Sequence, residues 1–465
     1  MLNVVRGNRR WVTRSADMGR GKEGATLPPK MRQSAFRNAW QTLRDPNALM
    51  FRGVTELGSV FRVGYPHMEA TVFGGREVMD ELLRLEQNGV LIAAGGFQAF
   101  REQFDAEHFI ADSDGDMHAV LRRRLARGHS SHAADPEKLV GAVDLMVGRW
   151  IEQDSIDLIP ELRRLFVCQA SATLVRAEDS VDMTDTLCYV SSFLLRVSLG
   201  HWPKPVLIWP PYRAAMRRVM AYITELADAL LAESADAEQP PLATALVNLY
   251  RSGDISRNEL ILSLFGPFIG GADTSTSTIA IALLDILERP DLHTAVRAEA
   301  IAYFAGDPCG VDPLAAMPHL WSALQESMRL NPAAPAVVRR AAEDFEFRGF
   351  QVLEGSMVII ATTASHRSEE HFPDPTAFIA DRFVDVRASN RTGYAPFGFG
   401  RRECIAKNWA KIQALLCIAR LLATCELEFV GNPGKPLRMT TFPPRTPKGL
   451  RMSVRPLERK DVDIH

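Results

Sequence analysis

The segment Phe397-Gly-Phe-Gly-Arg-Arg-Glu-Cys-Ile-Ala-Lys407 joins an irregular stretch of the chain to a helical pattern that continues to about Thr424. Its glycines permit tight turns, and Cys404 lies where the loop meets the helix. Backbone N–H groups at a helix start and basic neighbours stabilise the thiolate form of cysteine, which is the form that binds metals. Taken alone, Cys404 would be interpreted as an ordinary buried cysteine, so its assignment depends on the rest of the chain.

The longest helical pattern covers residues 258–288, or ~45 Å of helix. Ser256 and Glu259 form a capping box before it, and Arg289-Pro290 ends it. The pattern is apolar nearly all round, which predicts a helix buried at the centre of the fold. Its middle, Gly270-Gly-Ala-Asp-Thr-Ser-Thr276, contradicts the helix, because glycines and competing hydroxyl groups destabilise helix interiors. Such contradictions mark functional sites, and we expect the helix to be opened here.

Four more motifs stand elsewhere in the chain. They are His118-x-x-x-Arg122, Gly270-Gly-Ala-Asp-Thr-Ser275, Glu326-x-x-Arg329 and Phe372-Pro-Asp-Pro-x-x-Phe378-x-x-x-Arg382-Phe383. Together with Phe397-x-x-Gly400-x-Arg402-x-Cys404-x-Ala406, they resemble in order and spacing the motifs of the cytochrome P450 monooxygenases, over residues 58–455. One short motif arises by chance in many proteins, whereas five in the same order do not.

Two positions depart from the family pattern. Ala406 stands where the family usually has glycine, and Ala380 stands where it usually has proline. A methyl group at position 406 would crowd either the haem face or the helix behind it. The sequence therefore leaves the immediate surroundings of the haem open, although not haem binding itself.

The secondary-structure pattern is mainly helical. Apolar residues recur at helical spacing in residues 117–129, 186–200, 212–233 and 258–288. Short strands are expected at Val60–Gly64, Ala70–Phe73, Phe345–Phe347, Val352 and Met357–Ala361, with a helix at Glu77–Leu83. The resemblance implies the cytochrome P450 fold: a triangular prism-like single domain, mainly α with small β-sheets near the N-terminus and before the cysteine loop, crossed by a long central helix.

Domain boundaries are expected at the two ends only, because the chain contains no repeat and no Gly/Ser/Pro-rich linker. Residues 1–30 are expected to be a flexible N-terminal segment, residues 31–458 the haem domain, and residues 459–465 a C-terminal tail. The basic opening lacks the apolar run of a signal peptide, although a basic, acid-poor opening is also typical of transit peptides.

Composition excludes several classes of protein. Lys and Arg number 54 against 56 Asp and Glu, so the chain lacks the basic character of a nucleic-acid-binding protein. The six cysteines have neither metal-finger spacing nor the density of a secreted disulfide framework, which favours the cytoplasm. No run of ~18 apolar residues is present, so no membrane span is expected.

The resemblance implies haem b as the cofactor, with Cys404 as the ligand of its iron. A thiolate ligand donates electron density that favours O–O cleavage. The residues implied to contact the cofactor are Phe397, Gly398, His118, Arg122, Arg339 and Arg402, of which the last four would pair with the haem propionates. Arg340, beside Arg339, is an equally good candidate for that position.

Two further groups of residues take their roles from the resemblance. Glu326, Arg329 and Arg382 are implied to form a buried network that supports the cysteine loop and is structural rather than catalytic. Thr274 and Asp273 are implied to deliver protons to the bound oxygen, the hydroxyl donating and the carboxyl connecting to solvent. The alternative for this pair is a simple cap at a helix kink.

The substrate pocket is expected to be apolar. Its candidate lining residues, each of which is equally compatible with general core packing, are Phe97, Phe265, Phe268, Ile269, Ala272, Ala333, Ala336 and Val337. They favour a hydrophobic small molecule such as a terpenoid, fatty-acyl, steroid-like or polyketide compound.

Electrons must come from another protein, because the chain has neither a dinucleotide-binding fingerprint nor cysteines at iron–sulfur spacing. A ferredoxin- or flavodoxin-like donor with its NAD(P)H reductase fits the basic residues Arg122, Arg123, Arg124, Arg127, Arg401, Lys407 and Lys411, which are otherwise interpreted as a solvated face.

The function expected from these features is insertion of one oxygen atom from O2 into the substrate, by hydroxylation or epoxidation. Within haem chemistry the alternative is an oxidase that performs coupling, desaturation or nitration. From another class, a haem-binding gas sensor without turnover remains, as does a haem-free helical protein if the five motifs are coincidental.

Overall fold

The computed structural model describes residues 26–66, 68–93, 95–177, 180–199, 202–234, 239–306, 311–385, 393–431 and 450–457. Residues 1–25 of the expected N-terminal segment and the tail at 459–465 lie outside the described residues. Residues 26–30 belong to the folded part: Thr26 accepts a backbone hydrogen bond from Gln351 at 3.0 Å, and Pro28 accepts one from the Arg62 guanidinium at 2.8 Å. The segment expected to be flexible therefore overlaps residues that are bonded to two strands of the folded part, those that contain Arg62 and Gln351.

The main sheet has five strands in the order β1-β2-β8-β5-β3. Its strands are β1 (Val60–Tyr65), β2 (Met68–Gly74), β8 (Met357–Ala361), β5 (Val337–Ala341) and β3 (Leu91–Ala93). Only the β2–β8 pairing is parallel, with Ala70 opposite Met357. A three-stranded sheet, β4-β10-β9, joins Ile156–Asp157, Arg451–Pro456 and Cys425–Phe429, and a hairpin pairs β6 (Phe345–Phe347) with β7 (Phe350–Val352).

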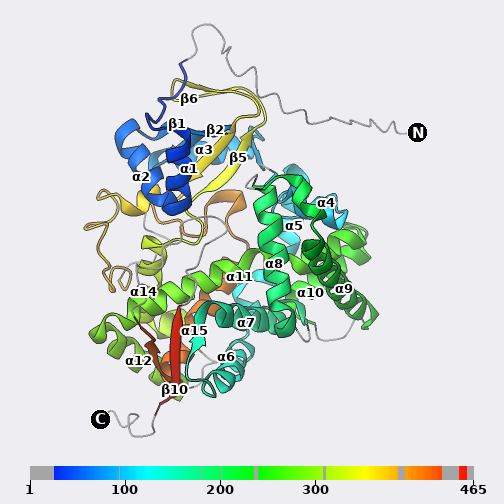
Figure 1. The fold of residues 1–465 in the computed structure, drawn as a ribbon, viewed down its shortest axis with the longest axis vertical. Helices are drawn as coiled ribbons and strands as arrows, with labels where there is room; N and C mark the ends of the chain where they lie inside the picture. The colour runs from blue at the N-terminus through cyan, green and yellow to red at the C-terminus, as the bar shows by residue number, and fades with distance from the viewer. Residues whose placement is uncertain are drawn as a thin grey trace.

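Helices form most of the described chain. They are α1 (Ala35–Arg44), α2 (Pro46–Leu57), α3 (Met79–Gln87), α4 (Gln98–Phe104), α5 (Gly115–Leu125), α6 (Pro136–Trp150), α7 (Leu158–Ala170), α8 (Ser180–Ser198), α9 (Pro210–Ala232), α10 (Pro241–Arg251), α11 (Arg257–Leu287), α12 (Pro290–Ala305), α13 (Pro313–Ala316), α14 (Pro318–Leu330) and α15 (Lys407–Thr424). Figure 1 shows the main sheet with α1, α2 and α3 at one end of the molecule and the helical part beyond it.

Helix α11 is the centre of the fold. It crosses the middle of the molecule (Figure 1) and packs against α7, α8, α14 and α15. The capping box at its start has both of its bonds: Glu259 N–H donates to the Ser256 hydroxyl at 3.3 Å, and Ser256 N–H donates to the Glu259 carboxylate at 2.6 Å. Its 31 residues include 19 that are buried, so the prediction of a long, buried central helix is confirmed.

Most strands and helices that the patterns predict are present within a few residues of the expected bounds. The segments at Phe345–Phe347 and Met357–Ala361 are strands with those limits. The segment at 117–129 divides into α5 and a short 3-10 helix, Arg127–His129. Among the described residues, the structure contains no helix that is both long enough and apolar enough to cross a bilayer.

Candidate functional site

The cysteine loop is held by its own backbone. Cys404 N–H donates to the Phe397 carbonyl at 2.9 Å, and Gly398 N–H donates to the Ala395 carbonyl at 3.1 Å. Gly398 and Gly400 have φ of 75° and 71°, a conformation that glycine adopts readily. At Gly400 a Cβ atom would also lie 2.1 Å from Leu83 Cδ2, so α3 packs directly on the loop. The residues quoted from the sequence thus form the tight turns expected of them.

Cys404 is the end point of this loop. Burial has the largest effect on its thiol and raises the pKa. A hydrogen bond from the Ala406 backbone and the positive charge of Arg122 act in the opposite direction and lower the pKa. The side chain is nevertheless exposed. Ala406 has φ of −89°, so the backbone at this position does not require glycine.

Three of the expected propionate partners lie around the loop. Arg122 donates to the Glu403 carbonyl at 2.7 Å, and Arg402 donates to the Ser113 carbonyl at 2.5 Å and to the Asp114 carboxylate. Burial, followed by the charges of Arg402 and Arg122, lowers the pKa of His118 to about 4. The site therefore has a positive potential that disfavours a further cation and favours an anion.

Arg339 belongs to the same cluster. Its guanidinium donates to Glu86 at 2.5 Å, and the charges of Arg402 and Asp114 act on its pKa, which burial lowers. Neighbouring residues of a strand point to opposite faces, and Arg340 instead donates to the Gly355 carbonyl at 3.0 Å on an exposed part of the surface. The structure therefore places Arg339, and not Arg340, beside Arg402.

These residues fit a haem with a thiolate ligand. The accessible sulfur receives a backbone hydrogen bond, as a bound thiolate requires. Arg122, Arg402 and the buried Arg339 supply positive charge beside the loop, as the binding of two carboxylates requires.

Helix α11 presents one open strip. The residues of its middle that are not buried are Gly266, Gly271 and Asp273, and a row formed by Ser263, Pro267, Gly270, Thr274 and Thr278. The spacing of three or four residues within this row places its members on one helix face. A Cβ atom at Gly270 would meet no atom within 4 Å, whereas one at Gly271 would lie 2.1 Å from the Phe166 ring of α7. The two glycines thus have different roles: Gly270 borders open space, and Gly271 permits close packing of α11 on α7.

The expected opening of the central helix is wrong, because every residue from Arg257 to Leu287 is helical. The Thr274 hydroxyl donates to the Gly270 carbonyl at 2.7 Å and lies 3.3 Å from the Gly271 carbonyl. The hydroxyl gives these carbonyls an additional hydrogen bond, and the helix continues through them. The neighbouring Asp273 turns away from this bond and pairs with Arg163 of α7 at 2.7 Å, while its second oxygen accepts from the Ser192 hydroxyl of α8 at 3.2 Å.

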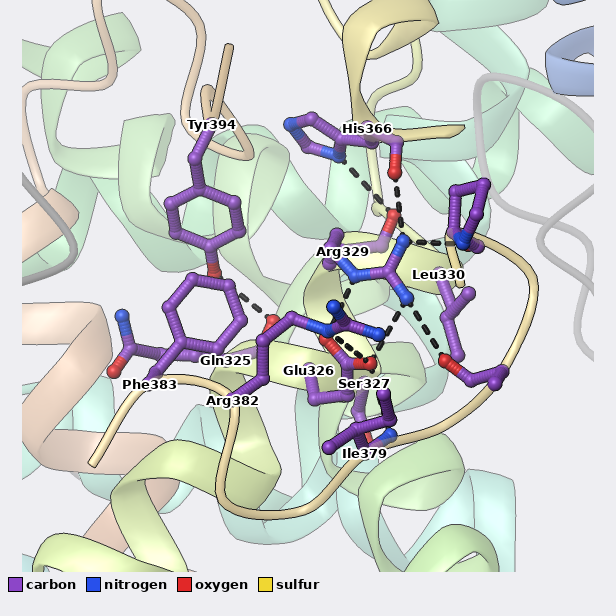
Figure 2. Close-up of polar contacts among 12 residues, drawn as sticks. Gln325, Glu326, Ser327, Arg329, Leu330, His366, Ile379, Arg382, Phe383 and Tyr394 are labelled. Atoms are coloured by element: carbon purple, nitrogen blue, oxygen red, sulfur yellow. Dashed lines mark hydrogen bonds and ion pairs between the residues drawn. The ribbon is translucent and has the colours of Figure 1, made fainter. Parts of the chain in front are cut away.

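Glu326, Arg329 and Arg382 are buried, and Figure 2 shows the contacts among them. The Glu326 carboxylate accepts from Arg329 at 2.7 and 2.9 Å, and from Arg382 and the Ile379 N–H at 3.0 Å each. The remaining guanidinium donors meet backbone carbonyls of the loop before the cysteine segment: those of Pro373, Asp374, Pro375, Ala377 and His366. The predicted ion pairs are present, and every charge has partners.

The expected pocket residues divide into two groups. Phe265, Phe268, Ile269 and Ala272 are buried in the core, and Phe265 stacks on Phe104 with ring centroids 5.7 Å apart. The half-buried members are Phe97, Ala333, Ala336 and Val337. Phe97 contacts Phe109 at 5.8 Å. Whether any of these side chains touches substrate stays a prediction.

Sequence reasoning missed the partners of these groups. Arg163 and Ser192, which bind Asp273, are 110 and 81 residues from it in the chain, and no local pattern marks them. His366, which bonds to the segment before the cysteine loop, follows a strand and carries no motif. These residues become visible only when the helices are packed together.

Comparisons with known proteins agree with this geometry. The model of the family described as Cytochrome P450 matches residues 28–450. The sterol 14alpha-demethylase of Mycolicibacterium vanbaalenii is 24% identical over 414 residues, covering 84% of this chain and 88% of that protein. The taxane 10-beta-hydroxylase of Taxus cuspidata is 23% identical, covering 80% and 78% respectively.

The fold agrees as well. The structure of retinoic acid bound cyanobacterial CYP120A1 superposes with a TM-score of 0.76 at 22% identity, over 93% of this chain and all of that one. The predicted family, fold, enzyme class and cofactor are therefore confirmed. This chain belongs to the cytochrome P450 family, the haem-thiolate monooxygenases.

Proposed function

We propose that this enzyme inserts one oxygen atom from O2 into an apolar small molecule, by hydroxylation or epoxidation, with electrons from a separate protein. The observation that carries the proposal is the open strip on α11, where Gly270 and Thr274 are not buried and a Cβ atom at Gly270 would meet no atom within 4 Å. An alcohol on such a strip, next in sequence to a carboxylate, is suited to proton delivery during cleavage of the O–O bond.

Cys404 would hold the haem iron, and the thiolate-bound haem would supply activation of O2. The Ala406 N–H donates to the sulfur, which tunes the electron density of the ligand. His118, Arg122, Arg339 and Arg402 would bind the propionates, with Phe397 and Gly398 along the loop. Glu326, Arg329 and Arg382 would keep the loop in place without touching the reacting atoms.

Proton delivery would be shared between two residues. The Thr274 hydroxyl, which donates to the Gly270 carbonyl, would rotate to donate a proton into the space beside Gly270. Asp273 would supply the proton from solvent, and its bonds to Arg163 and Ser192 hold the carboxylate in place until it does so. The threonine thus delivers the proton, and the aspartate connects the threonine to the surface.

The electron donor would bind beside the cysteine loop. Arg122 joins the end of α5 to Glu403, so the exposed Arg123, Arg124 and Arg127 lie on the elements next to the loop that carries exposed Arg401. A cluster of exposed cations favours an acidic protein by electrostatic steering. A ferredoxin- or flavodoxin-like donor with its NAD(P)H reductase has that chemistry, and the cysteine content of this chain supports a cytoplasmic location for the enzyme.

The substrate class follows from the apolar surroundings and from the relatives. Their names specify a sterol, a taxane and retinoic acid, all of them largely apolar isoprenoid compounds. The half-buried Phe97, Ala336 and Val337 are apolar side chains of the kind that would contact such a molecule. Apolar isoprenoids are therefore the first compounds to test.

The test begins with the spectrum of the dithionite-reduced protein with and without carbon monoxide. A red-shifted Soret band is expected only if the thiolate stays bound opposite the gas, and Cys404→Ser should abolish it. Apolar isoprenoids are then screened for a spin-state shift and for product formation with a donor and its reductase. Product analysis separates oxygen insertion from coupling, desaturation or nitration. Haem binding without a spin-state shift or any NAD(P)H consumption would overturn the proposal in favour of a gas sensor.

A further inference from the structure

One buried histidine connects two parts of the site that are distant in sequence. His366 lies in the 3-10 helix Ala364–Arg367 and is 1% exposed. Its Nδ1 lies 3.1 Å from the Arg329 carbonyl oxygen, and its Nε2 accepts from the Ala395 N–H at 2.9 Å. Figure 2 shows the ring beside Arg329 and above Tyr394. No motif in the sequence accounts for this residue.

These two bonds fix the state of the ring. A backbone N–H only donates, so Nε2 must offer a lone pair to Ala395 and the proton must be on Nδ1, where it is donated to the Arg329 carbonyl. Burial, the largest cause, lowers the pKa of His366 to about 3. The ring is therefore neutral at physiological pH. It stacks on Tyr394, with ring centroids 5.3 Å apart and an interplanar angle of 26°.

The bonds between His366 and Arg329 are reciprocal. The Arg329 guanidinium donates to the His366 carbonyl at 2.7 Å, while the His366 ring donates to the Arg329 carbonyl. Arg329 is also paired with Glu326. The histidine is thus rigidly attached to the buried ion-pair network at the end of α14.

From His366 the hydrogen bonds continue to the sulfur. The Ala395 N–H donates to Nε2 of the ring, and the Ala395 carbonyl accepts from Gly398 N–H at 3.1 Å. Two residues after Ala395, the Phe397 carbonyl accepts from Cys404 N–H at 2.9 Å. The Ala406 N–H then donates to the Cys404 sulfur. A shift of Ala395 would therefore move the turn that orients the cysteine.

We propose that His366 is a positioning residue, which transmits the rigidity of the Glu326–Arg329 network to the cysteine loop through the Ala395 N–H and so keeps the thiolate bound to the haem iron. The proposal rests on the proposed role of Cys404 as haem ligand and on nothing that concerns the substrate or the electron donor.

Two substitutions separate the two bonds. The amide of His366→Gln reaches the place of Nε2 and can accept from Ala395, whereas the shorter amide of His366→Asn reaches only the place of Nδ1 and can donate to Arg329. His366→Phe keeps the ring and removes both bonds. Tyr394→Phe is the matched control, because it removes one buried hydrogen bond of the same segment, that to the Gln325 carbonyl at 3.0 Å, and leaves the Ala395 bond intact.

The readout is the fraction of haem that shows the red-shifted band in the reduced carbon monoxide complex, measured for each holoprotein. We expect His366→Gln and Tyr394→Phe to keep most of the band, and His366→Asn and His366→Phe to lose more than about half of it, as expected when a hydrogen-bonded support of a metal ligand is removed. Equal loss in the Gln and Asn variants, or equal loss in Tyr394→Phe, would overturn the proposal in favour of general packing.

A second measurement needs no variant. The nitrogen-15 shifts of His366, in the diamagnetic reduced carbon monoxide complex of histidine-labelled wild type, should show a protonated Nδ1 and an unprotonated Nε2 between pH 6 and 8. A protonated Nε2 would overturn the proposal, because it cannot accept from Ala395. If wild type itself lacked the red-shifted band, Cys404 would lose its proposed role, and the tautomer in the haem-bound protein would still decide whether His366 holds Ala395.

Discussion

Arg163 on α7 donates from both Nε and Nη2 to the same oxygen of Asp273 on α11, at 2.9 and 2.7 Å. Ser192 on α8 holds the other oxygen at 3.2 Å. Three helices therefore converge on one carboxylate, which stands next to Thr274 on the central helix. The carboxylate that we propose as the proton source is therefore oriented by contacts from α7 and α8, and the importance of these contacts for proton delivery can be tested.

Replacement of Arg163 by Gln should impair proton delivery more than stability. It removes a partly buried ion pair, which we expect to cost about 1 kcal/mol, and leaves Asp273 without its orienting partner. We expect the share of O2 consumption that yields product to fall several-fold, while the carbon monoxide spectrum stays unchanged. The neighbouring Arg164→Gln, which breaks pairs with Glu161 and Asp185 instead, is the control. Equal uncoupling in both variants would remove Arg163 from the mechanism.

Substitution of Thr274 by Ala tests the alcohol. The helix should tolerate it, because Ala has a higher helix propensity than Thr by roughly 0.5 kcal/mol and the lost bond only reaches the Gly270 carbonyl of the same helix. Haem should bind normally, and oxygen use should shift from product to peroxide or water. Thr274→Ser keeps the hydroxyl and should remain coupled. Full coupled turnover in the alanine variant would exclude Thr274 from the reaction.

The buried network predicts a large effect on stability. Glu326→Gln leaves Arg329 and Arg382 buried without their shared carboxylate, which should cost ~3–5 kcal/mol and lower the haem content of the purified protein. Asp144→Asn, which breaks a bidentate but exposed pair with Arg420, should cost less than ~1 kcal/mol. Urea midpoints and haem-to-protein ratios measure both, and similar losses in the two variants would contradict the buried character of the first.

Asp285, on α11 beside the network, predicts a pH dependence. Burial raises its pKa to about 6, against a smaller lowering by the Ser327 hydroxyl, which donates to it at 2.7 Å. The folded state holds the proton more tightly than the unfolded state, so this carboxyl costs stability as the pH rises from about 4 to 6, and the full cost is present above that range. Asp285→Asn removes the cost.

We therefore expect Asp285→Asn to gain stability relative to wild type between pH 5 and pH 7.5, by an amount on the order of 1–2 kcal/mol. Urea unfolding at the two pH values measures it. Ser327→Ala should act in the opposite direction, since it removes the group that lowers the pKa of Asp285. A difference between the asparagine variant and wild type that does not change with pH would show that Asp285 does not titrate in this range.

The fold was predictable from the sequence where the signal was local. The apolar periodicity and the capping box at Ser256 and Glu259 indicated the long helix nearly to the residue. Strand β5 carries two adjacent arginines, Arg339 and Arg340, and was not expected as a strand at all. Its place is decided by pairing with β8 and β3, which no local pattern reveals.

The candidate site shows the same division. Motif spacing indicated Cys404, Glu326 and Arg329, because each belongs to a short pattern. The opening of α11 was expected from helix propensity, yet the Thr274 hydroxyl bonds to carbonyls of the same helix, and Gly271 is required by the Phe166 ring. Tertiary packing overrides propensity at this point.

The bond between Arg122 and the Glu403 carbonyl joins residues that are 281 positions apart. During synthesis at about 5–20 residues per second, the segment around Arg122 waits roughly 15–55 seconds for its partner to leave the ribosome. In that interval its cations face neither the cysteine loop nor the cofactor. A haem site that needs both segments is therefore incomplete until the cysteine loop has left the ribosome, and a nascent chain that stops before Phe397 lacks the ligand that we propose.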